Sequence, residues 1–259
     1  MPDVTIDTVA DVAAEAGRLA HLNWRGDFKV WEKSPGHQVC DVDVAVNDLL
    51  RARLTALDPE AGFLSEEALD STARLDKTRV WIVDPIDGTR DFIRGRPGWC
   101  VAVALVENGQ PLFGVLDAPA RRERWRAEAG KGASRNGLPI GVSDRAEFPG
   151  SRVPAHNLPK ADADLVCVDQ PNSIALRIAM VASAEADLVA TLRWGHEWDV
   201  AAAALIAREA GATVTDALGA PLTFNTHHAE AFGVLVATPR IHAAALDRIR
   251  GRAGKAVVR

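Results

Sequence analysis

The feature that most constrains the fold is the apolar run RVWIVD, residues 79–84, which ends in the segment WIVDPIDGTRDF (residues 81–92). An apolar run without alternation is typical of a strand whose two faces are both covered. Pro85 cannot donate to a strand ladder, so it is expected to end regular pairing. Gly88 then permits a backbone conformation that a side chain would disfavour. The strand is therefore predicted to end in a tight turn, and the chain must supply a covering layer on each side of the sheet.

This turn combines metal ligands with an anion pocket. Asp84 and Asp87 supply the hard oxygen atoms that Mg²⁺ prefers, and Mg²⁺ commonly shares its ligands with a substrate phosphate. Gly88 and Thr89 supply adjacent backbone N–H groups where a helix begins, a place that favours anions. The segment therefore indicates metal-assisted phosphate chemistry. The alternative is an ordinary turn with two capping aspartates.

Two other acidic motifs fit the spacing poorly. A calcium-binding EF-hand loop has acids at alternate positions and a Glu at the twelfth, and this segment has neither. Aspartyl-phosphate enzymes of the haloacid dehalogenase type have acids at i and i+2. Asp84 and Asp87 stand at i and i+3, and would not line one side of an extended chain.

Composition limits the class of protein. The 259 residues are 47% hydrophobic and 25% charged, with a formal net charge of -5, which is ordinary for a globular protein and argues against a nucleic-acid polymer as partner. Three cysteines without a C-x-x-C indicate neither a disulfide framework nor a zinc knuckle. The N-terminal segment lacks a signal-peptide pattern, and no apolar run approaches the roughly 20 residues of a membrane span. We therefore expect a cytoplasmic protein without a membrane segment.

Periodicity predicts two lobes. Residues 4–22 and 43–57 have apolar positions at helical spacing, and Asn108-Gly109 predicts a tight hairpin within residues 99–119. The stretch from 144 to 162 has little apolar periodicity, so a lobe boundary is placed there. Strands and helices alternate after it, which suggests a mixed α/β sheet.

Three further acidic positions could reach the same crevice. Glu66 follows a short predicted strand in AGFLSEE, although adjacent glutamates are common on surfaces. Asp43 opens the predicted helix 43–57, where it could equally serve as the helix N-cap. Asp199 stands in HEWDVAAAALIAREAGA, where an acid in the first helical turn also interacts favourably with the helix dipole. The alanines 201–204 leave little bulk, so the start of this helix can approach another element closely.

Taken together, DPIDGTRDF, EWDVAAAALIAREAGATVTDALGAPL and the upstream SEE resemble the inositol monophosphatase superfamily of Mg²⁺-dependent phosphatases. The resemblance extends from the first helix to the C-terminal VLVAT. Thr-Arg-Asp-Phe after Asp-Gly, and the segment SIALRIAMVASAEADL, are more similar to the 3'(2'),5'-bisphosphate nucleotidase branch than to the inositol branch.

The resemblance implies a layered α/β sandwich. Two long helices would cover an antiparallel sheet in residues 1–145, which would carry most metal ligands, and residues 146–259 would form a smaller α/β lobe with the Trp-Asp helix. Two or three Mg²⁺ ions would bind per active site, and a homodimer is plausible. The implied metal ligands are Glu66, Asp84, the Ile86 carbonyl, Asp87 and Asp199.

The resemblance also implies catalytic and substrate-binding roles. Asp43 and Thr89 would form a hydrogen-bonded pair that helps Glu66 activate a water molecule, and the Gly88 and Thr89 N–H groups would hold the phosphate. Asp199 would also contact substrate.

Two departures from the family pattern bear on the substrate. Cys40 replaces the usual Thr or Ser before the helix, and LRWGHEWD places Arg193, Trp194 and His196 before Asp199. Arg193 could pair with a second phosphate and Trp194 could stack on a base, while His196 could be either a substrate contact or a structural residue.

The predicted function is hydrolysis of a small phosphomonoester, adenosine 3',5'-bisphosphate, to AMP and phosphate. The alternatives are an inositol monophosphate or histidinol phosphate phosphatase and, from another class, a metal-binding regulator without turnover.

Overall fold

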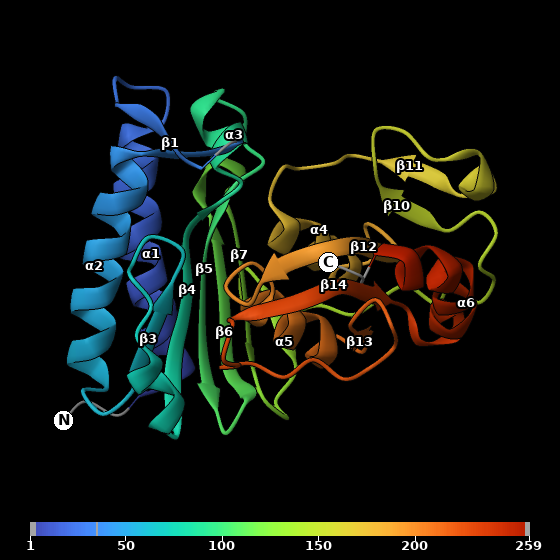
Figure 1. Cartoon of the computed structure of the whole chain (residues 1–259). Helices are drawn as coiled ribbons and strands as arrows, with labels where there is room; N and C mark the ends of the chain where they lie inside the picture. The colour runs from blue at the N-terminus through green and yellow to red at the C-terminus, as the bar shows by residue number, and fades with distance from the viewer. Residues whose placement is uncertain (1–3, 35, 257–259) are drawn as a thin grey trace.

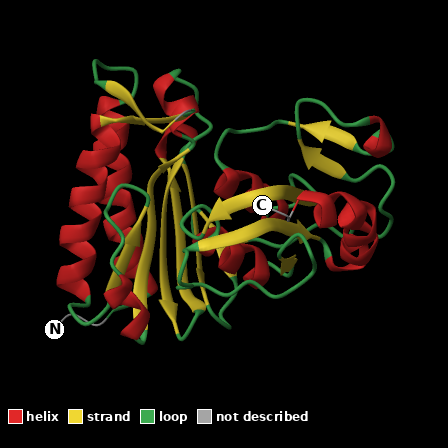
Figure 2. Cartoon of the chain, in the orientation of Figure 1, coloured by secondary structure: helices red, strands yellow, loops and turns green. Residues whose placement is uncertain are grey.

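The computed structural model describes residues 4–34 and 36–256 and arranges them in alternating layers of helix and sheet (Figures 1 and 2). One helical pair covers one face of a large sheet, a second pair covers the other face, and a smaller sheet and a last helix follow (Figure 1). The expected layered α/β sandwich is confirmed. The main helices are α1 (Ile6–Asn23), α2 (Asp41–Leu57), α4 (Ile174–Ala182), α5 (Ala201–Glu209) and α6 (Pro239–Ala256).

The large sheet has seven strands in the order β3-β4-β5-β6-β7-β8-β9, and only β3 and β4 are parallel. The hairpin between β5 and β6 turns at Asn108 and Gly109, with φ of 49° and 77°, as the sequence predicts. The strands are β3 (Gly62–Ser65), β4 (Arg79–Asp87), β5 (Cys100–Glu107), β6 (Gln110–Ala118), β7 (Glu123–Glu128), β8 (Ala133–Arg135) and β9 (Leu138–Pro139).

Both faces of β4 are covered, as its unbroken apolar run predicts. Trp81 and Val83 pack in the core beneath α1 and α2, whereas Val80 and Ile82 pack in the core beneath α4 and α5. This division follows from the strand, because successive side chains point to opposite faces of the sheet. The central strand is therefore held on both sides, and its C-terminal end is placed rigidly at the edge of the core.

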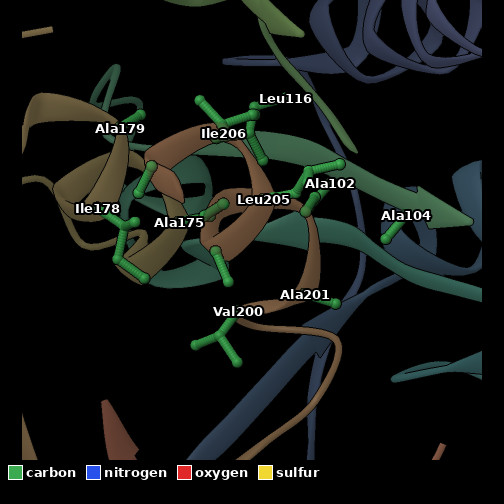
Figure 3. Close-up of a cluster of buried hydrophobic side chains, with 14 of the residues drawn as sticks. Ala102, Ala104, Leu116, Ala175, Ile178, Ala179, Val200, Ala201, Leu205 and Ile206 are labelled. Carbon is green, nitrogen blue, oxygen red and sulfur yellow. The ribbon is translucent and has the colours of Figure 1, made fainter. Parts of the chain in front are cut away.

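The alanine-rich helix α5 lies close against the large sheet. Figure 3 shows its Ala201, Leu205 and Ile206 beside Ala102 and Leu116 of the strands. A methyl group at Gly114 of β6 would lie 2.7 Å from a backbone oxygen of α5, so this glycine permits the close approach. The N-terminal end of α5 is thereby brought to the end of β4.

The smaller sheet departs from the prediction. It is antiparallel throughout, in the order β12-β14-β13, so the mixed sheet expected from the sequence is wrong. The helical crossover does make β12 and β13 run parallel to each other, but β14 returns between them in the opposite direction. The strands are β12 (Leu188–His196), β13 (Thr213–Thr215) and β14 (Glu230–Ala237).

Two short pairs of strands complete the fold. One of them joins β10 (Arg152–Pro154) to β11 (Val166–Val168), outside the smaller sheet. The hairpin of β1 (Val30–Ser34) and β2 (His37–Cys40) precedes α2. None of the helices described is both long and apolar enough to cross a membrane.

The division into lobes at residues 145 and 146 stays a prediction. The helix α5 comes from the second lobe but packs on β6 of the first, so the two segments share one core.

Candidate active site

A polar cleft of about 180 Å³ opens where β4, the β1–β2 hairpin, the start of α4 and the end of β12 meet. Every candidate site residue from the sequence lines this cleft except Trp194 and Asp43, and Asp43 accepts a hydrogen bond from Thr89. Those lining it are Glu66, Asp84, Ile86, Asp87, Gly88, Thr89, Arg193, His196 and Asp199.

A β-bulge brings the two aspartates of the turn to one side. Asp84 pairs with Ala102 and Asp87 pairs with Cys100, so three steps on β4 match two steps on β5. Ala102 and Cys100 stand two residues apart and therefore lie on one face of β5. The extra residue of the bulge places Asp84 and Asp87 on that same face. The expectation that the two acids would not line one side holds for a regular strand and is wrong here. Pro85 interrupts the regular ladder without ending β4, which runs to Asp87.

Asp87 is held by the N-terminus of α4. Its Oδ2 accepts hydrogen bonds from Ser173 Oγ at 2.6 Å and from the Ala175 N–H at 2.7 Å. Ser173 is the N-cap of α4 and accepts from the Leu176 N–H at 2.9 Å. One carboxylate therefore joins the end of β4 to a helix more than eighty residues away in sequence.

Gly88 and Thr89 form the turn after the bulge. Gly88 has φ of 97°, the left-handed region that favours glycine, and a Cβ there would lie 2.6 Å from the Gly98 carbonyl oxygen. Thr89 Oγ1 lies 3.0 Å from the Ile86 carbonyl oxygen and 3.3 Å from Asp43 Oδ1. The expected pairing of Asp43 with Thr89 is thus present.

Asp43 is not the N-cap of α2. The helix begins at Asp41 with Cys40 as N-cap, because Asp43 at the third helical position folds back to accept from the Cys40 N–H at 2.8 Å. Cys40 Sγ also lies 2.8 Å from the same oxygen, Asp43 Oδ2. Burial raises the pKa of Asp43 to about 6, against the opposing hydrogen bonds from Cys40.

Glu66 is paired with a cation that the sequence did not single out. Lys33, on β1, places its Nζ 3.2 Å from Glu66 Oε1 and also contacts Glu67. Glu67 is the more buried of the two side chains, and burial raises its pKa to about 7. Nothing in the polar loop around Lys33 identifies it, because only the fold brings β1 to the end of β3.

The sequence suggested that Asp199 lies in the first turn of α5, but Asp199 precedes this helix. The helix begins at Ala201, and Asp199 Oδ2 accepts from the His196 N–H at 3.2 Å. The His196 ring stacks on Trp198 with centroids 4.3 Å apart, and both rings line the cleft. Trp194 packs against Phe232 instead and is not among the cleft residues. The aromatic wall expected from Trp194 is therefore supplied by Trp198 and His196.

Three aspartates of the cleft, Asp84, Asp87 and Asp199, have raised pKa values. Burial, followed by the charges of Glu66, Asp87 and Asp199, raises the pKa of Asp84 well above its usual value. Burial and the charges of Asp87 and Glu66 raise the pKa of Asp199 to about 8, and burial raises that of Asp87 to about 6. Such a group of carboxylates is costly in a low dielectric unless a cation compensates it.

The donor set fits a hard divalent cation. Asp84 is 1% exposed, and its carboxylate accepts a hydrogen bond from the Ile86 N–H at 3.0 Å, which leaves lone pairs for a ligand. Among residues 4–34 and 36–256, no three acidic, histidine or cysteine side chains already converge as a metal-binding group. Without a cation, Glu66 pairs with Lys33 and Asp87 is bound to the start of α4.

The sequence matches the inositol monophosphatase family over residues 2–256. It is similar to the Nus factor SuhB of Xylella fastidiosa, with 35% identity over 85% of this chain and 84% of the relative. It is also similar to the histidinol-phosphatase of Chlorobaculum parvum, with 34% identity over 84% of this chain and 87% of the relative.

The fold agrees with the sequence comparison. The solved structure of an inositol monophosphatase from Thermotoga maritima superposes with a TM-score of 0.82 and 26% identity, over 96% of this chain and 98% of that one. The chain belongs to the inositol monophosphatase family. It is a metal-dependent phosphoric monoester hydrolase.

Proposed function

We propose that the cleft hydrolyses small phosphomonoesters by attack of water. The observation that carries the proposal is that Glu66, Asp84, Asp87 and Asp199 line one cleft together with Thr89. Mg²⁺, two or three ions per site, would be held by Glu66, Asp84, the Ile86 carbonyl, Asp87 and Asp199. When bound, it offsets the charge of the phosphoryl group and lowers the pKa of water.

The residues of this chain have separate tasks in the proposed reaction. Glu66 accepts the proton of the attacking water, and Asp43 and Thr89 orient that water. The Gly88 and Thr89 N–H groups bind phosphate oxygens. A new phosphorus–oxygen bond forms to water while the ester bond breaks, so the enzyme itself carries no phosphate.

We further propose that the substrate is adenosine 3',5'-bisphosphate. Arg193 lines the cleft beside Asp199, where a guanidinium can pair with a second phosphate. The His196–Trp198 pair offers a ring face for the base, in the place first assigned to Trp194. The alternatives are an inositol monophosphate, which has neither a second phosphate nor an aromatic ring, and histidinol phosphate, which is favoured by the similarity to a histidinol-phosphatase.

Phosphate release from these three compounds, with Mg²⁺ and with a chelator, tests both proposals. We expect turnover only with Mg²⁺ and the highest kcat/KM for adenosine 3',5'-bisphosphate. Arg193→Ala should lower kcat/KM for that substrate more than for inositol 1-phosphate, whereas the exposed control Arg250→Ala should change neither. Better turnover of inositol 1-phosphate or histidinol phosphate would replace the nucleotide assignment. No turnover of any phosphomonoester would favour a metal-binding regulator.

We also propose a cytoplasmic location and a homodimer. The three cysteines are free, which suits a reducing compartment. Sedimentation of the purified chain tests the dimer.

A further inference from the structure

Two buried charged residues, from two segments that each also supply an acid to the cleft, bind the same loop. Arg74 is 2% exposed and follows the Glu66 turn, whereas Glu197 is 0% exposed and precedes Asp199 by two residues. Both hold Asn225 and Thr226, in the loop that leads to β14. These four residues, Arg74, Asn225, Thr226 and Glu197, form what we call the buried bridge.

Arg74 fixes the Glu66 side of the cleft. Its Nε and Nη2 donate to the two oxygens of Asp70 at 2.7 and 2.9 Å, which closes the turn that follows Glu66. Its Nη1 donates to Asn225 Oδ1 at 2.7 Å and to the Thr226 carbonyl oxygen at 2.9 Å. Asn225 Nδ2 donates back to the Arg74 carbonyl oxygen at 3.1 Å. Side chain and backbone of Arg74 are therefore both tied to the loop.

Glu197 fixes the Asp199 side. Its carboxylate accepts from the Asn225 N–H at 2.6 Å, from the Thr226 N–H at 2.8 Å and from Thr226 Oγ1 at 2.5 Å. Its own carbonyl oxygen accepts from the N–H groups of Val200 and Ala201 at 3.2 and 2.9 Å. The turn that carries Asp199 is thus enclosed between the anchored Glu197 and the start of α5.

The loop is held in a conformation that ordinary residues adopt rarely. Asn225 and Ala229 have φ of 60° and 52°, and neither is glycine. Such backbone persists where surrounding contacts over-determine it, and it often accompanies functional sites. A buried arginine and a buried glutamate that meet through an intervening loop, without touching each other, are also costly unless fully hydrogen-bonded.

We propose that the buried bridge is a positioning element. It fixes the separation of Glu66 and Asp199 across the cleft and thereby sets the affinity of the cleft for a divalent cation. This inference rests on the proposed function, in which these two acids bind Mg²⁺. The bridging residues touch neither substrate nor the reacting atoms, so their effect passes through the two turns.

The test compares two hydroxyl groups that each donate to a buried carboxylate. Thr226→Val removes the hydroxyl group that donates to Glu197. The matched control Ser143→Ala removes a hydroxyl group that donates to Asp187 at 2.6 Å, in another part of the fold. Calorimetric titration with Mg²⁺ measures the Kd, and melting temperatures measure stability. We expect both variants to melt lower, but only Thr226→Val to weaken Mg²⁺ binding, by roughly 10-fold, the lower end of the effect of residues that bind metal ligands directly. Thr226→Ser should restore the affinity.

A second variant removes the other half of the bridge. Asn225→Gly keeps the left-handed backbone available but loses the contacts to Arg74, and it should weaken Mg²⁺ binding as well. If both Thr226→Val and Asn225→Gly bind Mg²⁺ as wild type does while melting lower, the bridge is structural only and the inference is overturned. A wild-type protein that binds no Mg²⁺ overturns the proposed function itself, and the bridge as a cation-site element with it.

Discussion

Ser173 Oγ donates to Asp87 Oδ2 at 2.6 Å, so a carboxylate of the cleft also caps α4. Within residues 4–34 and 36–256, Asp84, three residues earlier, accepts a hydrogen bond only from the Ile86 N–H, at 3.0 Å. Both side chains are buried. Without a metal, Asp87 is therefore stabilised by hydrogen bonds from α4, which Asp84 does not receive. Replacing either acid should consequently have a different effect on stability.

Asp84→Asn should abolish activity without lowering stability. Burial and the charges of Glu66, Asp87 and Asp199 raise the pKa of its carboxyl, so an amide, which does not ionise, removes the cost of ionising this group. We expect kcat to fall by at least about 100-fold, since even an indirect metal partner contributes roughly 10–100-fold. In a chelator the melting temperature should equal or exceed that of wild type. A lower melting temperature would show that the charge stabilises the metal-free fold.

Asp87→Asn should abolish activity and also destabilise the protein. The amide carries less negative charge at the start of α4, where the Ser173 hydroxyl and the Ala175 N–H now donate to a carboxylate. The cost should be about 1 kcal/mol, as for other lost helix caps, measured by urea unfolding in a chelator. The sequence alone predicts that both variants are no less stable than wild type. If Asp87→Asn proved no less stable than wild type, as Asp84→Asn should, the simpler expectation would hold and the capping role of Asp87 would be wrong.

Local signals predicted much of the site. Asp84, Asp87 and Gly88 could be placed because apolar strand, proline and glycine stand next to one another in the sequence. The grouping of Asp43 with Thr89 came from a family resemblance, and the structure places them 3.3 Å apart. The covering of both faces of β4 was predictable from its unbroken apolar run, whereas the layered sandwich itself came from the family resemblance.

Features that depend on tertiary contacts could not be predicted. The bulge between Asp84 and Asp87 is a property of pairing with β5, and nothing in the turn itself reveals it. The salt bridge of Lys33 to Glu66 requires a hairpin to reach the end of another strand. The sequence does not show which of the two tryptophans, Trp194 or Trp198, faces the cleft. Only the direction of β12 and of the turn after it decides that Trp198 faces the cleft.

Without metal, stability should fall as pH rises from about 5 to 8. The pKa of Asp87 is raised to about 6 and that of Asp199 to about 8, above the usual value of an unfolded aspartate near 4. A raised carboxyl pKa means that the folded state holds more protons, so its contribution is present at low pH and is lost as pH passes the folded pKa. Melting temperatures in a chelator at pH 5.5 and 8 measure this.

Two variations check the cause of this pH dependence. Asp199→Asn should flatten the profile, because the group with the higher pKa is removed. Saturating Mg²⁺ should stabilise the protein more at pH 8 than at pH 5.5, because the cation binds ionised carboxylates. A stability that rises with pH in the chelator would contradict the assignment of these buried acids.

Lys33→Gln should tighten Mg²⁺ binding and destabilise the metal-free protein. The Lys33 ammonium lies 3.2 Å from Glu66, where it competes with a divalent cation for the carboxylate and repels that cation. Two unit charges about 4 Å apart interact by about 1 to 4 kcal/mol between water and a protein surface, so a gain of about five-fold or more in affinity is expected. Titration calorimetry measures the gain, and Lys29→Gln, on an exposed lysine of the same segment, is the control. Unchanged or weaker Mg²⁺ binding in Lys33→Gln alone would mean that the lysine supports the Glu66 turn and does not oppose the metal.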